Sequence, residues 1–177
     1  MHGLAQREGA ITSHVRYQKE VFEDERKNLQ SSIISYGDAD LYICFEPIEA
    51  LRRGIFASEK TTFVINDRDI PSVMVTADLE EYPSLERIRE ILEGYSKNVF
   101  FLNATDLSLE MFKTNKFVNI IMLGYAIVTE KIPFIEISHY EEVIREWLSD
   151  PELNIQALHL GINEAKKSNF QSQLTEK

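Results

Sequence analysis

Cysteine is nearly absent from this chain of 177 residues, which contains only Cys44. A single thiol excludes an internal disulfide, and it cannot supply the four thiolates that an iron–sulfur cluster or a cysteine-rich zinc site requires. Such sparing use of cysteine is typical of a reducing compartment. We therefore expect a cytoplasmic protein that holds no metal.

Glycine and long apolar runs are also scarce. The seven glycines never fall in the Gly-x-Gly-x-x-Gly spacing, and no Gly-Lys-Ser/Thr sequence closes a phosphate loop. The chain therefore has no complete cradle for nucleotide phosphates of its own. No apolar run approaches the roughly 20 residues that span a bilayer, and the first residues have no secretory h-region. We expect neither a membrane span nor a secretory signal.

Basic residues are outnumbered, because 19 Lys and Arg face 29 Asp and Glu and leave a net charge of −10. Nucleic-acid binding depends mainly on Lys and Arg contacts to phosphates, so this balance argues against a nucleic-acid partner. Hydrophobic residues make up 44% and charged residues 27%, as in an ordinary globular protein. The length favours one domain, which we place at residues 1–167, with a polar tail at 168–177.

Short apolar runs alternate with amphipathic segments along the chain. Runs rich in apolar and β-branched residues predict strands at 10–17, 41–45, 61–65 and 99–102, with room for a further edge strand at 73–75. Helical spacing predicts helices at 46–55, 84–94, 103–113, 118–130, 138–148 and 153–167. This alternation predicts an α/β fold, a three-layer α/β/α sandwich with a largely parallel or mixed, Rossmann-like sheet.

The segment His2–Gly9 is the most unusual part of the sequence. Its two glycines allow tight turns, and Gln6 and Arg7 add amide and guanidinium donors, a pattern that can grip a partner or an anionic ligand. A flexible N-terminal stub is the alternative interpretation. Arg16 follows on the first predicted strand, where it can present its charge at the strand end or lie on a solvated face.

Other polar residues have simpler interpretations. Glu46 and Glu49 can form an acid–base pair, although both also complement the dipole of the helix that they open. Cys44 lies in an apolar run and is expected to be an inert core thiol. Three histidines show no spacing typical of metal ligands: His14, His139 and His159.

Two asparagine–glycine pairs mark the last helices. Asn119 and Asn154 are expected to cap helices, and Gly124 and Gly161 follow them at positions that permit close helix packing. The Ser-x-x-Glu pattern at Ser138–Glu141 predicts a capping box for the helix between them.

Several of these segments occur in the order found in one protein family. His2–Gly9 matches the pattern His-Gly-Met-x-Gln-Arg-Gly-Gly, and a predicted strand ending in Val15-Arg16 follows it. Further matches are Gly37–Leu41, Glu46–Arg52, Asn66, Asn119–Gly124 and Asn154–Gly161. From His2 to about Ala165 the chain resembles the gamma subunit of the 2-oxoacid:ferredoxin oxidoreductases. Within that family it is most similar to the beta subunit of indolepyruvate:ferredoxin oxidoreductase.

The sequence departs from the family pattern in two places. Glu8 stands where the pattern has the first glycine of a Gly-Gly pair. Family members also carry a strand, a Gly-x-Gly-Gly-Gln-Gly turn and a helix before the Gln-Arg motif, and this sequence does not contain them. We therefore expect the first βα unit of the family fold to be missing here.

The resemblance implies an accessory subunit of an enzyme that oxidatively decarboxylates a 2-oxoacid to an acyl-CoA and passes electrons to ferredoxin. It implies that this chain binds no cofactor. Thiamine diphosphate, iron–sulfur clusters and coenzyme A would then belong to the partner subunits of a hetero-oligomer. It implies that Gly3, Gln6, Arg7 and Arg16 contact a partner or substrate and are not catalytic. The alternative is an independent α/β protein that binds a small molecule or a nucleotide without catalysis.

Overall fold

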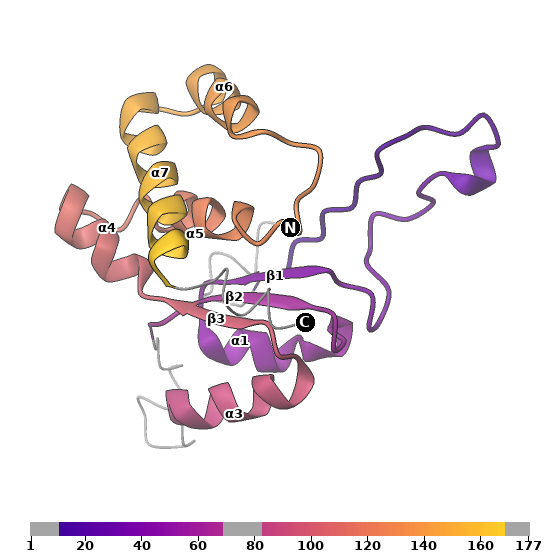
Figure 1. Ribbon diagram of the computed structural model, residues 1–177, viewed down its shortest axis with the longest axis horizontal. Helices are drawn as coiled ribbons and strands as arrows, with labels where there is room; N and C mark the ends of the chain where they lie inside the picture. The colour runs from indigo at the N-terminus through magenta and orange to yellow at the C-terminus, as the bar shows by residue number, and fades with distance from the viewer. Residues whose placement is uncertain (1–10, 69–82, 169–177) are drawn as a thin grey trace.

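The structure, a computed structural model, describes residues 11–68 and 83–168 (Figure 1). Its strands are β1 (Leu41–Cys44), β2 (Thr62–Asn66) and β3 (Val99–Leu102). Its helices are α1 (Pro47–Arg52), α3 (Leu85–Tyr95), α4 (Ala104–Phe112), α5 (Val118–Ile127), α6 (Ile137–Trp147) and α7 (Pro151–Lys167). Two short 3-10 helices are η2 (Glu25–Lys27) and η3 (Gly54–Phe56).

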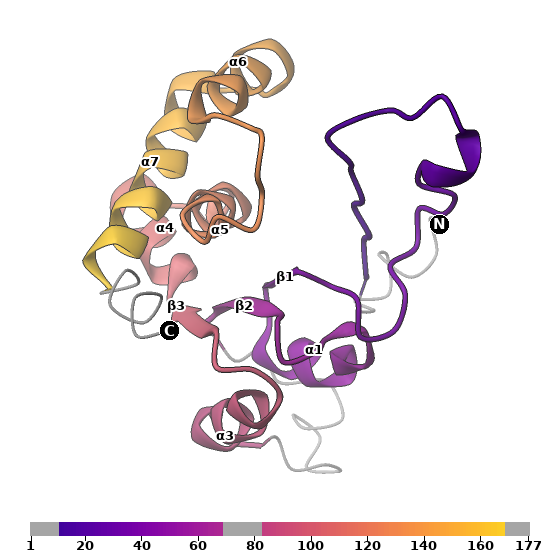
Figure 2. The same ribbon diagram turned by 45° about the vertical axis from the view of Figure 1, so that its right-hand side comes forward.

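The three strands form one parallel sheet in the order β1-β2-β3. Leu41 of β1 pairs with Thr62 of β2, and Phe63 of β2 pairs with Val99 of β3. α1 and α3 cover one face of the sheet. α5 lies against the other face, α4 and α7 pack on α5, and α6 packs on α7 (Figures 1 and 2). Helices on both faces of a parallel sheet confirm the predicted α/β fold.

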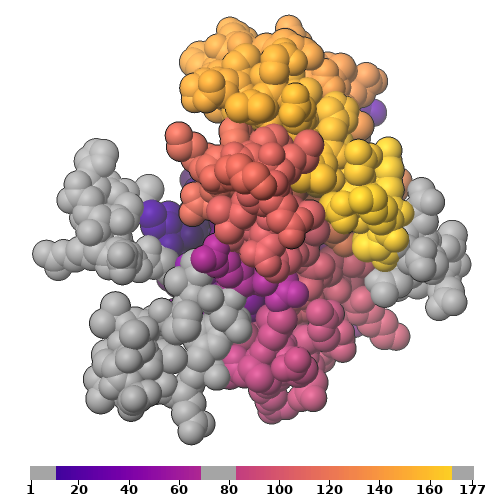
Figure 3. All heavy atoms as spheres, turned by 90° about the vertical axis from the view of Figure 1, so that its left-hand side faces the viewer, coloured from indigo at the N-terminus to yellow at the C-terminus, as the bar shows by residue number. Residues whose placement is uncertain are grey.

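A separate apolar core lies on each face of the sheet, because successive side chains of a strand point to opposite faces. Phe63 and Ile65 of β2 pack toward α1 and α3, whereas Val64 packs with Ile121 and Leu158 of α5 and α7. α6 and α3 lie at opposite ends of the molecule in the side view of Figure 3. All five residues of β2 are buried, as expected for the central strand.

Most helix starts follow local sequence signals. Ser84 Oγ accepts a hydrogen bond from Arg87 N at 3.2 Å and caps α3. Asn103 Oδ1 accepts one from Asp106 N at 3.0 Å and caps α4 in the same way. Pro47 occupies the first turn of α1, where its missing N–H has no intrahelical partner to lose.

α5 and α7 cross at two glycines. An ideal Cβ on Gly124 would lie 2.1 Å from Leu158 O, and one on Gly161 would lie 1.9 Å from Ile121 O. Both neighbours are backbone atoms, so no side-chain movement can relieve the clash. The prediction that these two glycines permit close helix packing is confirmed.

The predicted capping box at the start of α6 is wrong. α6 begins at Ile137, one residue before Ser138, and Glu136 is its N-cap residue. Glu136 N donates to the His139 Nδ1 acceptor at 3.2 Å, and His139 N donates to Glu136 O at 3.0 Å. The capping box thus lies two residues earlier than predicted, with the His139 ring in the place that a glutamate takes in the Ser-x-x-Glu pattern.

Neither asparagine caps its helix. Asn119 is the second residue inside α5, and Phe117 takes the N-cap position. Asn154 lies in the first turn of α7, where its Nδ2 donates to Ser149 O at 2.8 Å and to Asp150 O at 3.2 Å. Its amide thus satisfies carbonyls that precede the helix instead of amides within it.

The prediction of a strand at 10–17 is wrong for the residues that the structure describes. Residues 11–17 pair with no strand, and residues 11–36 form an extended segment, here called the arm, that leaves the sheet and returns to β1 (Figures 1 and 2). Side chains hold the arm together, as where Gln18 Nε2 donates to Asn28 Oδ1 at 2.8 Å. Alternating apolar residues indicate an extended backbone but do not specify a pairing partner.

Some predictions fall outside the described residues. These are the edge strand at 73–75 and the part of the tail after Ser168. The domain boundary at residue 167 stays a prediction. In the part of the chain that the structure covers, no helix has both the length and the apolar character needed to cross a membrane.

Candidate functional site

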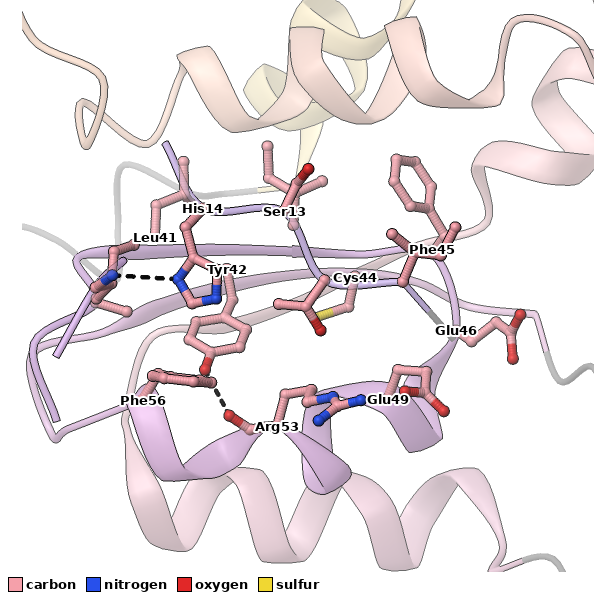
Figure 4. A pocket seen from close by; sticks show the side chains of 15 residues that line it. Ser13, His14, Leu41, Tyr42, Cys44, Phe45, Glu46, Glu49, Arg53 and Phe56 are labelled. Carbon is pink, nitrogen blue, oxygen red and sulfur yellow. Dashed lines mark hydrogen bonds between the residues drawn. The ribbon is translucent and has the colours of Figure 1, made fainter. Parts of the chain in front are cut away.

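A cavity of about 350 Å³ lies between the start of the arm and β1 (Figure 4). Residues 11–14 form one wall, and β1 with α1 forms the opposite wall. The lining residues are Ile11, Thr12, Ser13, His14, Ile34, Ala39, Leu41, Tyr42, Ile43, Cys44, Phe45, Glu46, Glu49, Arg53 and Phe56. The volume is in the range of pockets that hold small ligands.

The wall formed by β1 is a strand edge with no pairing partner in residues 11–68 and 83–168. Asp40 O accepts a hydrogen bond from Thr62 N at 2.9 Å. This bond and the register of the two strands identify the residues whose backbone groups point toward β2. Because backbone direction alternates along a strand, the backbone groups of Leu41 and Ile43 point away from β2. Among the described strands none pairs with this side. The edge can therefore accept the backbone of an extended segment.

Aromatic rings line the cavity, and their polar atoms bond to the protein's own backbone. His14 Nδ1 accepts from Ile34 N at 3.3 Å, and the His14 ring stands edge-on to Phe56 with centroids 4.9 Å apart. The Tyr42 hydroxyl donates to Arg53 O (Figure 4). Burial raises the pKa of Tyr42 to about 12, so it stays neutral. This part of the cavity suits an apolar or aromatic group.

Two carboxylates lie where β1 passes into α1. Glu49 Oε1 forms an ion pair with Arg52 NH1 at 2.6 Å. Burial, with a smaller contribution from Glu49, raises the pKa of Glu46, and no ion pair involves Glu46 in the described segments. Glu46 is therefore the carboxyl available to a donor group of a ligand. Acid–base work by the two glutamates stays a prediction.

Cys44 lines the same cavity but is only 7% exposed. Burial raises the pKa of its thiol to about 12, so the thiol is protonated at neutral pH. This agrees with the interpretation of Cys44 as an inert core thiol. Residues 11–68 and 83–168 contain no group of three or more His, Cys, Asp or Glu side chains placed to hold a metal ion.

The predicted contact residues are only partly covered by the structure. Gly3, Gln6 and Arg7 lie outside the described residues, and their role stays a prediction. Arg16 lies on the arm, where its NH1 donates to Ser31 O at 2.9 Å. The guanidinium thus joins the outgoing and returning halves of the arm and shapes the wall that carries His14.

Sequence reasoning missed several residues of this region. Tyr42 could have been found, because alternation along β1 places it on one face with Cys44. Phe56 carries no such signal, since the short 3-10 helix η3 after α1 brings it to the cavity. Asn66 is buried, and its Nδ2 donates to Phe45 O at 3.1 Å and to Thr105 Oγ1 at 3.0 Å, which ties the end of β1 to α4.

Comparisons with known proteins agree with the resemblance noted from the motifs. The family described as "Pyruvate ferredoxin/flavodoxin oxidoreductase" matches residues 1–164. The "Indolepyruvate oxidoreductase subunit IorB" of Archaeoglobus fulgidus is 33% identical over 166 residues, covering 93% of this chain and 77% of that protein. The protein of the same name from Pyrococcus horikoshii is 32% identical over 172 residues, covering 94% and 79%. The chain therefore belongs to the pyruvate ferredoxin/flavodoxin oxidoreductase family.

Proposed function

We propose that this chain is an accessory subunit of an oxidoreductase that acts on 2-oxoacids, with indolepyruvate as the expected substrate and ferredoxin as the electron acceptor. The observation that carries the proposal is the similarity to proteins named as subunits of indolepyruvate oxidoreductase. It extends over 93% of this chain in the protein from Archaeoglobus fulgidus and over 94% in the one from Pyrococcus horikoshii.

In this proposal the redox and thiamine chemistry belongs to a larger partner subunit. One cysteine cannot ligate an iron–sulfur cluster, and Cys44 is a buried, protonated thiol. The sequence has no complete phosphate cradle, so thiamine diphosphate and coenzyme A are expected on the partner or in the assembled complex. A reducing cytoplasm is the proposed location, because it suits both the free thiol and the clusters of the partner.

The proposed contacts are Gly3, Gln6, Arg7 and Arg16. Gln6 and Arg7 bring several N–H donors to one short segment, and two glycines beside them allow a close backbone approach. Arg16 supports this by joining the outgoing and returning halves of the arm. These residues would bind the partner and would not react with substrate.

The test is the affinity between this chain and the thiamine-dependent subunit. Arg7→Ala is expected to weaken binding at least tenfold, because it removes a guanidinium fork, and the melting temperature is expected to stay unchanged. Arg87→Ala is the matched control, since Arg87 lies on α3 and pairs with Glu90 at the surface. An unchanged affinity for Arg7→Ala would contradict the gripping role.

The cavity beside β1 favours one second candidate, an independent protein that binds a small molecule. Its aromatic lining and the carboxyl of Glu46 suit a flat apolar group that carries an amine or hydroxyl donor. This function predicts saturable ligand binding by the isolated chain and no stable complex with a thiamine-dependent subunit. Isothermal titration calorimetry with such ligands distinguishes the two proposals.

A further inference from the structure

A group of large apolar side chains is exposed on α6 and on the segment that leads into it. This group, here called the α6 band, consists of Phe134, Ile135, Ile137, Val143 and Trp147. Trp147 is 75% exposed, Phe134 62% and Val143 56%. Exposed aromatic and aliphatic residues in one patch mark interaction sites more often than scattered ones do.

α7 covers only part of the apolar stripe of α6. Ile144 is 4% exposed and belongs to the core shared with α7. Val143 and Trp147 are four residues apart, so they share one face of the helix, adjacent to the face of Ile144. Tyr140, which lies between the two faces, is partly buried. The apolar stripe of α6 is therefore wider than the part of it that α7 covers.

The arm contacts the Phe134 end of the α6 band. The Tyr17 hydroxyl donates to Lys131 O at 3.3 Å, and Lys19 Nζ lies 5.5 Å from the centroid of the Phe134 ring. These contacts bring the arm against the segment before α6. Val21, two residues beyond Lys19 on the arm, is 88% exposed. A segment far away in sequence therefore borders the α6 band.

Along α6 the rim of the α6 band is acidic, whereas Lys19 lies over Phe134 at its arm end. Glu142, Glu146 and Asp150 flank Val143 and Trp147 in sequence, and none of these three takes part in an ion pair in the described part of the chain. Arg145, the one basic residue of α6, is already paired with Glu141 at 3.1 Å. A second copy would place acids against acids between chains of net charge −10, so the rim favours a different, basic partner.

We propose that the α6 band is the docking surface for the larger, thiamine-dependent subunit. Trp147 is the anchor that enters an apolar recess of the partner, and Lys or Arg residues around that recess face Glu142 and Glu146. Tryptophan is enriched among the residues that dominate binding energy, and charges at the rim fix orientation. This inference rests on the proposed accessory function and deepens it by naming the surface.

The experiment measures the dissociation constant between the full chain and the thiamine-dependent subunit that co-purifies with it from native extract. Trp147→Ser is expected to weaken binding at least 30-fold, which is about 2 kcal/mol at 1.4 kcal/mol per tenfold. Tyr95→Ser is the matched control, because Tyr95 is 50% exposed at the end of α3, which lies opposite α6 in Figure 3. Glu142→Lys with Glu146→Lys is a second, independent variant, expected to weaken binding at least tenfold.

Each outcome is decisive. Loss of affinity in Trp147→Ser and in the double variant, with Tyr95→Ser like the wild type, supports the docking surface. If the wild type binds the subunit and both variants bind it with an affinity within threefold of the wild type, the docking surface is wrong and the accessory function stands. If the wild type captures no thiamine-dependent subunit, the proposed accessory function is wrong. If, in that case, the wild type self-associates and Trp147→Ser abolishes this, the α6 band binds a second copy of this chain.

Discussion

The crossing of α5 and α7 offers the sharpest test of how the fold is held together. In Gly161→Ala the new methyl would lie 1.9 Å from Ile121 O, whereas even close carbon–oxygen contacts are about 3.3 Å. The obstacle is a backbone carbonyl within a helix, so the two helices must separate by more than about 1 Å. That separation loosens packing around Leu158 and Tyr125, which are buried at this contact.

Two opposing effects set the size of the change. Forcing a methyl into a packed helix contact costs up to about 3 kcal/mol. Alanine in place of glycine within a helix recovers about 1 kcal/mol. The net loss is about 2 kcal/mol, or a melting temperature about 4–8 °C lower for a chain of this length. Gly94→Ala in α3 is the control, because no described atom beyond its chain neighbours and the nearby backbone of its own helix lies within 4 Å of its ideal Cβ. It should gain about 0.5–1 kcal/mol.

Urea denaturation followed by circular dichroism measures both variants against the wild type. Gly161→Ala should unfold at lower urea concentration and Gly94→Ala at higher concentration, with the slope of the transition unchanged. The reasoning is refuted if Gly161→Ala is as stable as the wild type, because the helices would then not need this close approach.

Three further predictions concern the cavity and the arm. Cys44 should react with Ellman's reagent at pH 8 only after unfolding, because a pKa of about 12 leaves about one thiol in ten thousand as thiolate. Labelling of the native chain at the rate of a free thiol would contradict this. Glu46→Gln should stabilise the chain at pH 7, because the pKa of Glu46 is raised in the folded state and its ionisation costs stability as the pH rises. The gain in stability should vanish below the ordinary pKa of 4.5. A stability difference that does not change with pH would contradict the raised pKa of Glu46. Arg16→Ala removes the donor to Ser31 O and should speed cleavage of the arm by proteinase K several-fold, with an unchanged cleavage rate as the opposing result.

The elements that the sequence predicted best are those governed by local signals. α3 combines a Ser84 cap with apolar residues at helical spacing, and Ile88 and Leu92 are buried as that spacing requires. The central strand β2 was recognisable because it is apolar on both faces, as a strand covered by helices must be. Gly124 and Gly161 were recognisable as packing positions because each follows a helical apolar run.

The features that escaped prediction depend on distant contacts. The residues at 11–17 have strand-like composition, but whether a strand forms depends on a neighbour that composition does not specify. The cap of α6 uses the His139 ring, which does not fit the usual serine–glutamate pattern. The cavity joins the arm to β1 and to the loop that carries Phe56, a juxtaposition that only the tertiary structure provides.

The most direct test of the accessory function is the composition and activity of the complex that forms around this chain. The chain is purified from native extract, its partners are identified by mass spectrometry, and turnover of indolepyruvate with ferredoxin is measured for the chain alone and for the complex. We expect one larger thiamine-dependent subunit at equal stoichiometry, with turnover only in the complex. A chain that purifies alone, or that turns over a 2-oxoacid without a partner, would contradict it.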